Sequence, residues 1–464
     1  MRRPAQLIIS ATVFVDLLGF TLILPALPFY ATELGATGLW FGALVSAYSV
    51  AQLVAAPLLG RLSDRYGRRP LVLLALAGTA VSMALTGLST SLPALLACRL
   101  VAGLSGGSIS VAQAYLADVV PEERRTGAMA QMGASIGMAF VLGPALGGLL
   151  APLGFAACAY AAAALAALNF AAALIGLPEP PRIRAAAIGT PGHPQAPALT
   201  LEADAPGPLG GHEPGGSGRP VRREAVPAGA EAGAAAQAAE SRAKPDADDG
   251  RPRPDADESR ARPDGAAPAV TARSGGRAPV ALLAATGFLA MAAFVGMETT
   301  LAFLGRDRYG WDATSIGLAL AAAGVAMAAA QAGLVPWLAR RWGDSRVAAA
   351  GAVTMTVCMV AVAVSGAWWQ GLTAVCLLAA GHGLLTPTVS SLLAACGPAE
   401  RRGARLGTGQ SAAAAARVVG PALAGLLFDA GTALPYLAGA VAAALAAVAV
   451  LAVPAPESSV PESA

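Results

Sequence analysis

The sequence has few charged residues and almost no lysine. Of its 464 residues, 13% are Asp, Glu, Lys or Arg, whereas about a quarter are charged in a typical soluble domain. Lys244 is the single lysine. The formal net charge is only +3, and the arginines are scattered rather than gathered into the basic stripe that is typical of a nucleic-acid-binding protein. The composition therefore argues against a soluble globular domain and against a nucleic-acid partner.

Cysteine pairs and catalytic motifs are equally sparse. The five cysteines lie in or beside apolar runs, without the paired spacing of a disulfide framework or a metal site. The sequence has no Gly-rich phosphate loop followed by Lys, so ATP is not expected as an energy source. A nucleophile with a base and an orienting residue is also missing from the apolar runs, which argues against a membrane enzyme. We expect no enzyme, no metal and no cofactor.

Apolar residues are what the sequence has in excess, at 56% of the chain with a mean hydropathy of +0.60. Runs of about 18–25 apolar residues alternate with short polar gaps, and one such run crosses a hydrocarbon core of about 30 Å. The first run is too long for a signal peptide and lacks a small-residue cleavage site, so we expect it to remain as a membrane anchor. The predicted spans are residues 7–30, 38–59, 71–88, 92–115, 126–151, 155–177, 280–304, 313–338, 347–365, 368–393, 404–428 and 433–453.

The chain divides into three predicted parts. Residues 1–177 and 279–464 hold six spans each, and the second of these parts includes a short tail. Residues 178–278 are rich in Ala, Pro, Gly, Arg and Asp and contain almost no aromatic or β-branched residues. Such a segment cannot bury enough apolar surface to offset its ordering entropy, so we interpret it as a disordered linker. It is either a low-complexity spacer or a regulatory segment.

Arginine placement predicts the orientation in the membrane. The polar gaps between spans fall alternately on the two sides of the membrane. The gaps on the side of the N-terminus carry most of the arginines outside the linker, whereas the gaps on the other side carry only Arg306 and Arg308. Short cytoplasmic loops collect Lys and Arg. We therefore expect a multi-pass protein of the cytoplasmic membrane, in contact with the lipid bilayer, with both termini and the linker in the cytoplasm.

The two halves repeat each other. Pro121–Arg125 is echoed by Pro398–Arg402, and Gly143–Gly148 is echoed by Gly420–Gly425. Both echoes share one offset, because 398 − 121 and 420 − 143 each equal 277. An equal offset with six spans in each half means that the halves have the same orientation, which is a parallel repeat. Such repeats bind their substrate between the halves, near the midplane.

The polar stretch after the second span reads Gly-Arg-Leu-Ser-Asp-Arg-Tyr-Gly-Arg-Arg over residues 60–69. It closely resembles the signature loop of the major facilitator superfamily. The resemblance implies an all-α membrane fold of twelve helices in two six-helix halves, and it assigns Asp64 and Arg65 to gating. The simpler alternative is that the arginines only fix the topology. The remaining gating-loop residues are Gly60, Gly67, Arg68 and Arg69.

The first and fourth spans each contain one charged residue well inside the membrane, Asp16 and Arg99. Arg99 is followed by Gly103 and Gly107 at four-residue steps, which places it above a smooth helix face. This pattern is similar to the fourth-span motif of the superfamily that is linked with proton coupling. A charge inside lipid needs a partner or a wet cavity. We hypothesise an Asp16–Arg99 pair in which protonation of Asp16 is tied to transport; a static pair between helices is the alternative.

The fifth span carries Gly143, Pro144, Gly147 and Gly148. These residues resemble the motif found mainly in drug/proton antiporters of the superfamily. Their glycines predict a groove for helix packing, and the proline predicts a kink. The resemblance therefore implies export in exchange for protons.

The second half has one acid and one base well inside its spans, Glu298 and Arg417, for which we expect a pair or a shared water cavity in proton coupling. His382 lies near the middle of the tenth span, where it either takes part in transport or is simply hydrogen-bonded. The other polar residues that could line a substrate cavity are Tyr48, Gln52, Gln113, Gln331 and Gln410.

The first span contains the run Val15–Phe20 followed by Pro25 and Pro28, and this pattern looks like the first span of tetracycline-type exporters. The run Asp307–Trp311 also looks like the corresponding segment of those exporters. Two further membrane aspartates of the enterobacterial tetracycline pumps correspond to Ser82 and Met355, and their eighth-span histidine to Met327. The resemblance thus leaves the substrate open. We expect a monomeric secondary transporter that uses the proton gradient, without a cofactor, to export a small molecule such as a drug, antibiotic or metabolite. Proton-coupled or facilitated uptake and a non-transporting receptor are the alternatives.

Overall fold

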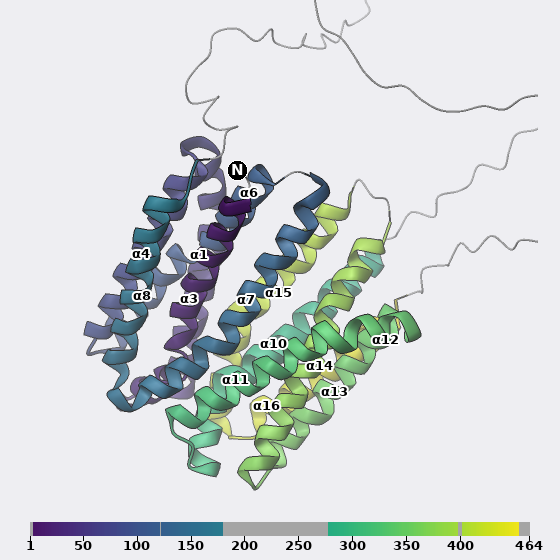
Figure 1. Ribbon diagram of the computed structural model, residues 1–464. Helices are drawn as coiled ribbons and strands as arrows, with labels where there is room; N and C mark the ends of the chain where they lie inside the picture. Colours follow the sequence, from purple (N-terminus) through teal and green to yellow (C-terminus); the bar gives the residue numbers. More distant parts are fainter. Residues whose placement is uncertain (1–2, 121, 180–276, 398–400, 454–464) are drawn as a thin grey trace, which may run out of the picture. The chain divides into compact units, whose positions relative to one another are not determined.

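The structure is a computed structural model that describes residues 3–120, 122–179, 277–397 and 401–453, and this part of the chain is almost entirely helical (Figure 1). The helices of the N-terminal half are α1 (Arg3–Leu22), α2 (Leu27–Glu33), α3 (Gly38–Tyr66), α4 (Arg68–Leu88), α5 (Leu92–Ser105), α6 (Ser108–Val119), α7 (Glu122–Leu150) and α8 (Phe155–Gly176). The helices of the C-terminal half are α10 (Arg277–Tyr309), α11 (Ala313–Ala329), α12 (Val335–Trp342), α13 (Asp344–Val364), α14 (Trp368–Ala395), α15 (Arg402–Ala430) and α16 (Leu434–Leu451).

Twelve segments of the described chain are long and apolar enough to cross a membrane, which confirms the predicted all-α fold. Three of these segments are interrupted. Helices α1 and α2 together form the first (Gln6–Glu33), and α5 and α6 form the fourth (Leu92–Val119). In the eighth, a π-helical turn at Ala330–Leu334 joins α11 to α12. Helices suit this environment because they satisfy their own backbone hydrogen bonds in lipid.

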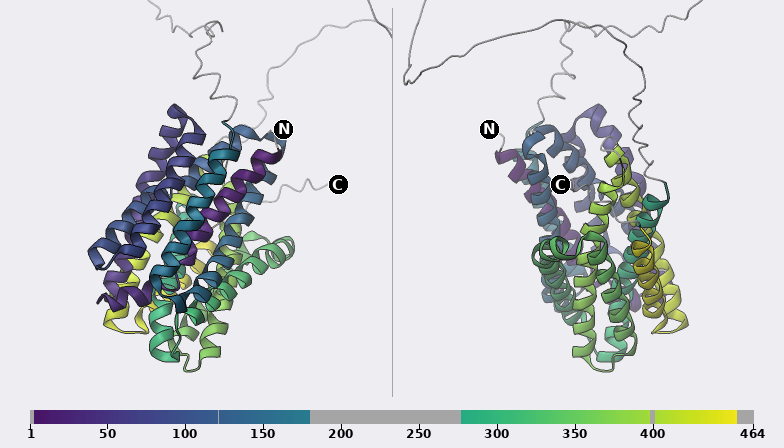
Figure 2. Two further views of the ribbon diagram at one scale, coloured as in Figure 1. Left: turned by 60° about the vertical axis from the view of Figure 1, so that its left-hand side comes forward. Right: turned by 90° about the vertical axis from the view of Figure 1, so that its right-hand side faces the viewer.

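Each half has its own apolar core. In the N-terminal half, α1 packs on α7 and α8, and α4 packs on α8. In the C-terminal half, α13 packs on α14 and α16, and α10 packs on α16, around a single large buried cluster. Figure 2 shows these helices from two further sides, with those of the N-terminal half in purple to blue and those of the C-terminal half in green to yellow. The three-part division stays a prediction, since residues 180–276 of the expected linker lie outside the described residues.

The halves meet along two helix pairs, α3 with α15 and α7 with α11. A Cβ atom added to Gly38 would lie 2.6 Å from the carbonyl oxygen of Gly425, and one added to Gly148 would lie 3.0 Å from the Cα of Gly317. Only glycine permits backbones to approach this closely. All four glycines belong to the end of the bundle that carries Asp312, the N-cap of α11. We call this the Asp312 end.

Within the N-terminal half, helix α7 also packs closely on α1 through glycines. Added Cβ atoms on Gly143 and Gly147 would collide with Thr21 and with the backbone of Leu22, respectively. The Thr21 hydroxyl also donates a hydrogen bond of 3.0 Å to the carbonyl oxygen of Ala139 on α7. The glycines that resemble the antiporter motif therefore seat α7 between α1 of its own half and α11 of the other.

We predict that Gly147→Val lowers the thermal stability of the detergent-purified protein, because the added side chain would collide with the backbone of Leu22. Gly137→Val is the matched control on the same helix, since a Cβ there meets nothing within 4 Å. Overpacking of this kind typically costs about 1–3 kcal/mol. Equal melting temperatures for the two variants would contradict the close packing of α7 on α1.

Candidate functional site

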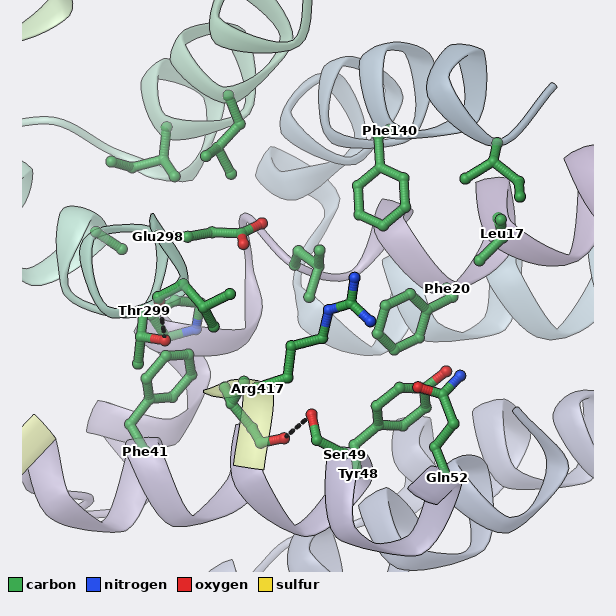
Figure 3. Close-up of a pocket in the computed structure, with 18 of the residues that line it drawn as sticks. Leu17, Phe20, Phe41, Tyr48, Ser49, Gln52, Phe140, Glu298, Thr299 and Arg417 are labelled. Carbon is green, nitrogen blue, oxygen red and sulfur yellow. Dashed lines mark hydrogen bonds between the residues drawn. The ribbon is translucent and has the colours of Figure 1, made fainter. Parts of the chain in front are cut away.

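A cavity of about 380 Å³ lies between the two halves (Figure 3). Its lining comes from α1, α2, α3, α6 and α7 on one side and from α10, α11 and α15 on the other. Apolar side chains make up most of it, and the rings of Phe20 and Tyr48 stack with their centroids 4.4 Å apart. The aromatic residues of the lining are Phe20, Phe41, Tyr48 and Phe140. A mainly apolar cavity of this size with a few polar groups is typical of a small-molecule site.

Glu298 from α10 and Arg417 from α15 both extend into this cavity (Figure 3). They do not form the direct pair that was one of our expectations, because the ion pairs found among the described residues involve neither side chain. No hydrogen bond to Arg417 is present within the described chain either. Glu298 and Arg417 thus line the same cavity without forming an ion pair or a hydrogen bond with each other. Gln52 and Gln410 also line it.

Asp16 is buried in a crevice beside the cavity. Its Oδ2 atom accepts a hydrogen bond of 2.7 Å from the Ser108 hydroxyl, whereas its Oδ1 atom is buried without a hydrogen-bond partner. The crevice shares Leu17, Phe20 and Tyr48 with the main cavity. Asp16 therefore lies in a space that shares part of its lining with the main cavity.

The expected Asp16–Arg99 pair is wrong for this structure. Arg99 is 2% exposed, and its Nε and Nη2 atoms have no hydrogen-bond partner. The reason is the level of these residues along the fourth span, because Ser108, beyond the break at residues 106–107, is the residue that contacts Asp16. Arg99 lies nine residues earlier in the chain, which is more than two helical turns at about 1.5 Å per residue.

His382 lines a second cavity of about 150 Å³ between α10, α14 and α15, which we call the side pocket. The imidazole stacks on Phe294 with ring centroids 4.4 Å apart, and its Nε2 atom lies 3.3 Å from the Thr386 hydroxyl. Its Nδ1 atom is buried without a partner. Gln410 and Arg417 line both the side pocket and the main cavity.

Gln113 and Gln331 do not belong to these cavities, contrary to our expectation. Gln113 is exposed because α6 turns its Val111 and Leu116 face into the core. Gln331 is exposed on the π-helical turn after α11. The rotation of a helix about its axis decides which of its residues face a cavity, and a single polar residue in the sequence does not specify that rotation.

The predicted gating loop is almost entirely helical. Only Gly67 separates α3 from α4, with a φ of 103° that favours glycine. Arg68 is the hub of the charges here, since it lies 2.6 Å from the Asp64 carboxylate and 2.9 Å from that of Asp118. Arg65 instead lies over the Tyr66 ring, 5.5 Å from its centroid. The ion pairs thus involve Arg68 rather than Arg65, and both stay within the N-terminal half.

Two carboxylates of this network could not be recognised from the sequence. Asp118 lies in α6, and Glu179 follows α8 at the start of the expected linker. Glu179 accepts hydrogen bonds from the backbone nitrogens of Arg68 and Arg69, at 2.8 and 3.2 Å. It therefore caps the first turn of α4, where a negative charge is favourable.

A third carboxylate, Asp429, joins the two halves. From the last turn of α15 it accepts hydrogen bonds from the backbone nitrogens of Gly38 and Leu39, at 2.7 and 2.8 Å. These are free N–H groups of the first turn of α3, at the positive end of the helix dipole. A second link between the halves is the hydrogen bond of 2.8 Å from the Thr314 hydroxyl to the carbonyl oxygen of Gly148. Both links lie at the Asp312 end.

The sequence profile of the Major Facilitator Superfamily matches residues 9–343 and 283–464. The chain belongs to the major facilitator superfamily. Membership of this family, together with the twelve apolar helices of the described chain, makes the protein an integral membrane transporter.

The named relatives of this family member include tetracycline resistance proteins. Over 424 residues it is 29% identical to the class G protein of Vibrio anguillarum, which covers 90% of this chain and 89% of the relative. The class E protein of Escherichia coli is 39% identical over 170 residues, and this alignment covers 36% of the chain and 42% of the relative.

Two solved structures show the same fold. The human organic anion transporter MFSD10 (TETRAN) is 22% identical with a TM-score of 0.59, covering 97% of this chain and 99% of that one. The nucleoside transporter NupG is 12% identical with a TM-score of 0.63, covering 97% and 98%. At such identities the likeness is one of fold alone.

We predict that Arg68→Gln destabilises this transporter more than Arg65→Gln, its matched neighbour. The first change leaves two carboxylates without their ion pair, whereas the second removes an exposed ring contact. Hydrogen bonds to charged groups are worth about 1.5–3 kcal/mol. Melting temperatures of both variants in detergent test this, and a larger loss in Arg65→Gln would contradict the role of Arg68 as the hub.

We predict that Asp429→Ala loosens the Asp312 end. Hydrogen–deuterium exchange should rise in residues 38–45 of α3 and also in residues 313–320 of α11, because losing the cap favours separation of the halves there. Glu33→Ala, an exposed acid at the end of α2, is the control. A rise confined to α3 would mean that Asp429 is only a local cap.

Proposed function

We propose that the protein exports a small molecule across the cytoplasmic membrane in exchange for protons, by alternating access to the main cavity. The observation that carries this proposal is the position of Asp16, a buried carboxylate in a crevice that shares lining residues with the cavity between the halves. A carboxylate there can gain or lose a proton beside bound cargo. An ionised acid is costly to bury, so each conformation has its own proton affinity, and that difference couples protons to transport.

The direction of access follows from the contacts between the halves. Those contacts lie at the Asp312 end, where Asp429 and the glycines of α3, α7, α11 and α15 hold the halves together. The arginine-rich loops lie at the opposite end, which the preference of arginine for inside loops assigns to the cytoplasm together with both termini and the linker. The structure then corresponds to a state closed at the outer end.

Export, rather than uptake, is supported by two observations. Residues Gly143, Pro144, Gly147 and Gly148 resemble the antiporter motif, and they pack α7 against both α1 and α11. Relatives named as tetracycline resistance proteins match the chain, one of them over 90% of its length. In this proposal one chain is the transport unit, Asp16 carries the proton, and Glu298 is a second proton site. The proton gradient is the energy source, without a cofactor.

We predict that Asp16→Asn abolishes proton-driven export from energised cells. Coupling free energies of about 1–3 kcal/mol correspond to changes of roughly 5–150-fold, so export should fall by about tenfold or more. The measurement is efflux of tetracycline and a panel of unrelated drugs, with and without a protonophore and at equal membrane levels of protein. Glu33→Gln, an exposed acid outside the cavity, is the control and should retain export.

Three outcomes would count against this proposal. Export that persists in Asp16→Asn would remove Asp16 from the coupling. Transport that is indifferent to the protonophore would indicate facilitated diffusion. Accumulation of a compound driven inward would establish uptake.

A further inference from the structure

Arg417 lies where the main cavity and the side pocket meet, since it lines both. Its side chain is exposed to these spaces, and the described chain provides it with neither an ion pair nor a hydrogen bond. A charge at this depth in a membrane protein is costly unless water or a counter-charge compensates it. The guanidinium thus has no ion-paired or hydrogen-bonded partner in the described chain.

The side pocket is suited to a negative charge. Among the described residues that line it, none is an acid and Arg417 carries the one formal charge. Glu298 lines the main cavity but not the side pocket. The polar residues of the side pocket are His382, Thr386, Ser390, Gln410 and Arg417.

The side pocket is large enough for an anionic group, and its lining includes a histidine with an unpartnered ring nitrogen. Its volume is about 150 Å³, whereas one water occupies about 30 Å³ in the liquid. A carboxylate with a few waters therefore fits. His382 lines the pocket, and its Nδ1 atom is buried without a partner; in the tautomer protonated at Nδ1 this atom is a hydrogen-bond donor.

We propose that Arg417 and the side pocket bind the anionic group of the cargo, and that the cargo is an organic carboxylate with an aromatic body. This inference rests on the proposed transport through the main cavity. The carboxylate accepts two parallel hydrogen bonds from the Arg417 guanidinium, whose planar fork matches its geometry. The aromatic body lies in the main cavity against the rings of Phe20, Tyr48 and Phe140.

Other cargo charges fit less well. An organic cation placed in the side pocket would face Arg417 and no carboxylate. A neutral cargo would desolvate the guanidinium while offering it no counter-charge of its own. Glu298 faces the main cavity and remains available for protonation, apart from the side pocket.

Gly287 permits a test of the side pocket without disturbing Arg417. It lines the pocket from α10, and a Cβ added there meets nothing within 4 Å. Gly287→Leu therefore fills the pocket without a backbone clash. Gly333→Leu is the matched control, because an added Cβ is equally unhindered there and Gly333 lines neither cavity.

The experiment is isothermal titration calorimetry on the full-length protein in detergent. The probes are benzoate, 1-naphthoate and biphenyl-4-carboxylate, with naphthalene-1-carboxamide as the neutral isostere and 1-naphthylmethylamine as the cation. We expect at least one carboxylate to bind the parent, and naphthalene-1-carboxamide to bind more weakly than 1-naphthoate. Arg417→Gln and Gly287→Leu should each weaken carboxylate binding about tenfold or more, the scale of a lost charged hydrogen bond. Gly333→Leu should bind as the parent does, and unchanged elution and melting profiles show that the variants are folded.

The inference is overturned if none of the three carboxylates binds the parent, or if the acid and the amide bind alike. It is also overturned if Arg417→Gln or Gly287→Leu retains parental affinity for the carboxylate. The transport proposal fails by a different result. If carboxylates bind but transport is not coupled to protons, the proposal of proton-driven export is wrong. If proton-driven export occurs but carboxylates do not bind, only the proposed anion site is wrong.

Discussion

The close approach of the two halves at the Asp312 end is the constraint on which the rest of the structure depends. Glycine backbones of α3 and α15, and of α7 and α11, lie so close that an added methyl group would collide. Helix packing in lipid gains little from the hydrophobic effect, so surfaces of small residues provide the contact instead. The main cavity lies between the halves, and its lining includes all four of the helices that make this contact.

The polar contacts differ between the two ends of the helix bundle. The Asp429 carboxylate meets free N–H groups of α3 across the boundary between the halves, and the Arg68 network stays within the N-terminal half at the opposite end. One end therefore has polar bonds between the halves, whereas the ion pairs described at the other end stay within one half. This asymmetry is what a carrier needs to hold one conformation without making it permanent.

Two of the residues that line the cavities, Asp16 and His382, have buried polar atoms without hydrogen-bond partners. The Asp16 Oδ1 atom, the Arg99 Nε and Nη2 atoms and the His382 Nδ1 atom all lack hydrogen-bond partners. In most proteins such groups are rare, because each costs free energy that a partner would offset. The places of Asp16 and His382 in the lining of the cavities agree with a site that exchanges protons and cargo rather than one that only stabilises the fold.

The sequence by itself determined the membrane fold, because runs of apolar residues of bilayer length can only be buried in lipid as helices. The equal offset between the halves also predicted the parallel repeat, and the sequence at residues 60–69 pointed to the family. The tertiary structure alone decided which charges are partners. Helix packing placed Ser108 rather than Arg99 on Asp16, and helix rotation put Gln410 on a cavity while it left Gln113 outside. Asp429 shows the same limit, since its partners lie about 390 residues away along the chain. Spacing along a helix specifies a face, but contact between helices depends on their tilt, rotation and breaks, which many distant side chains set together.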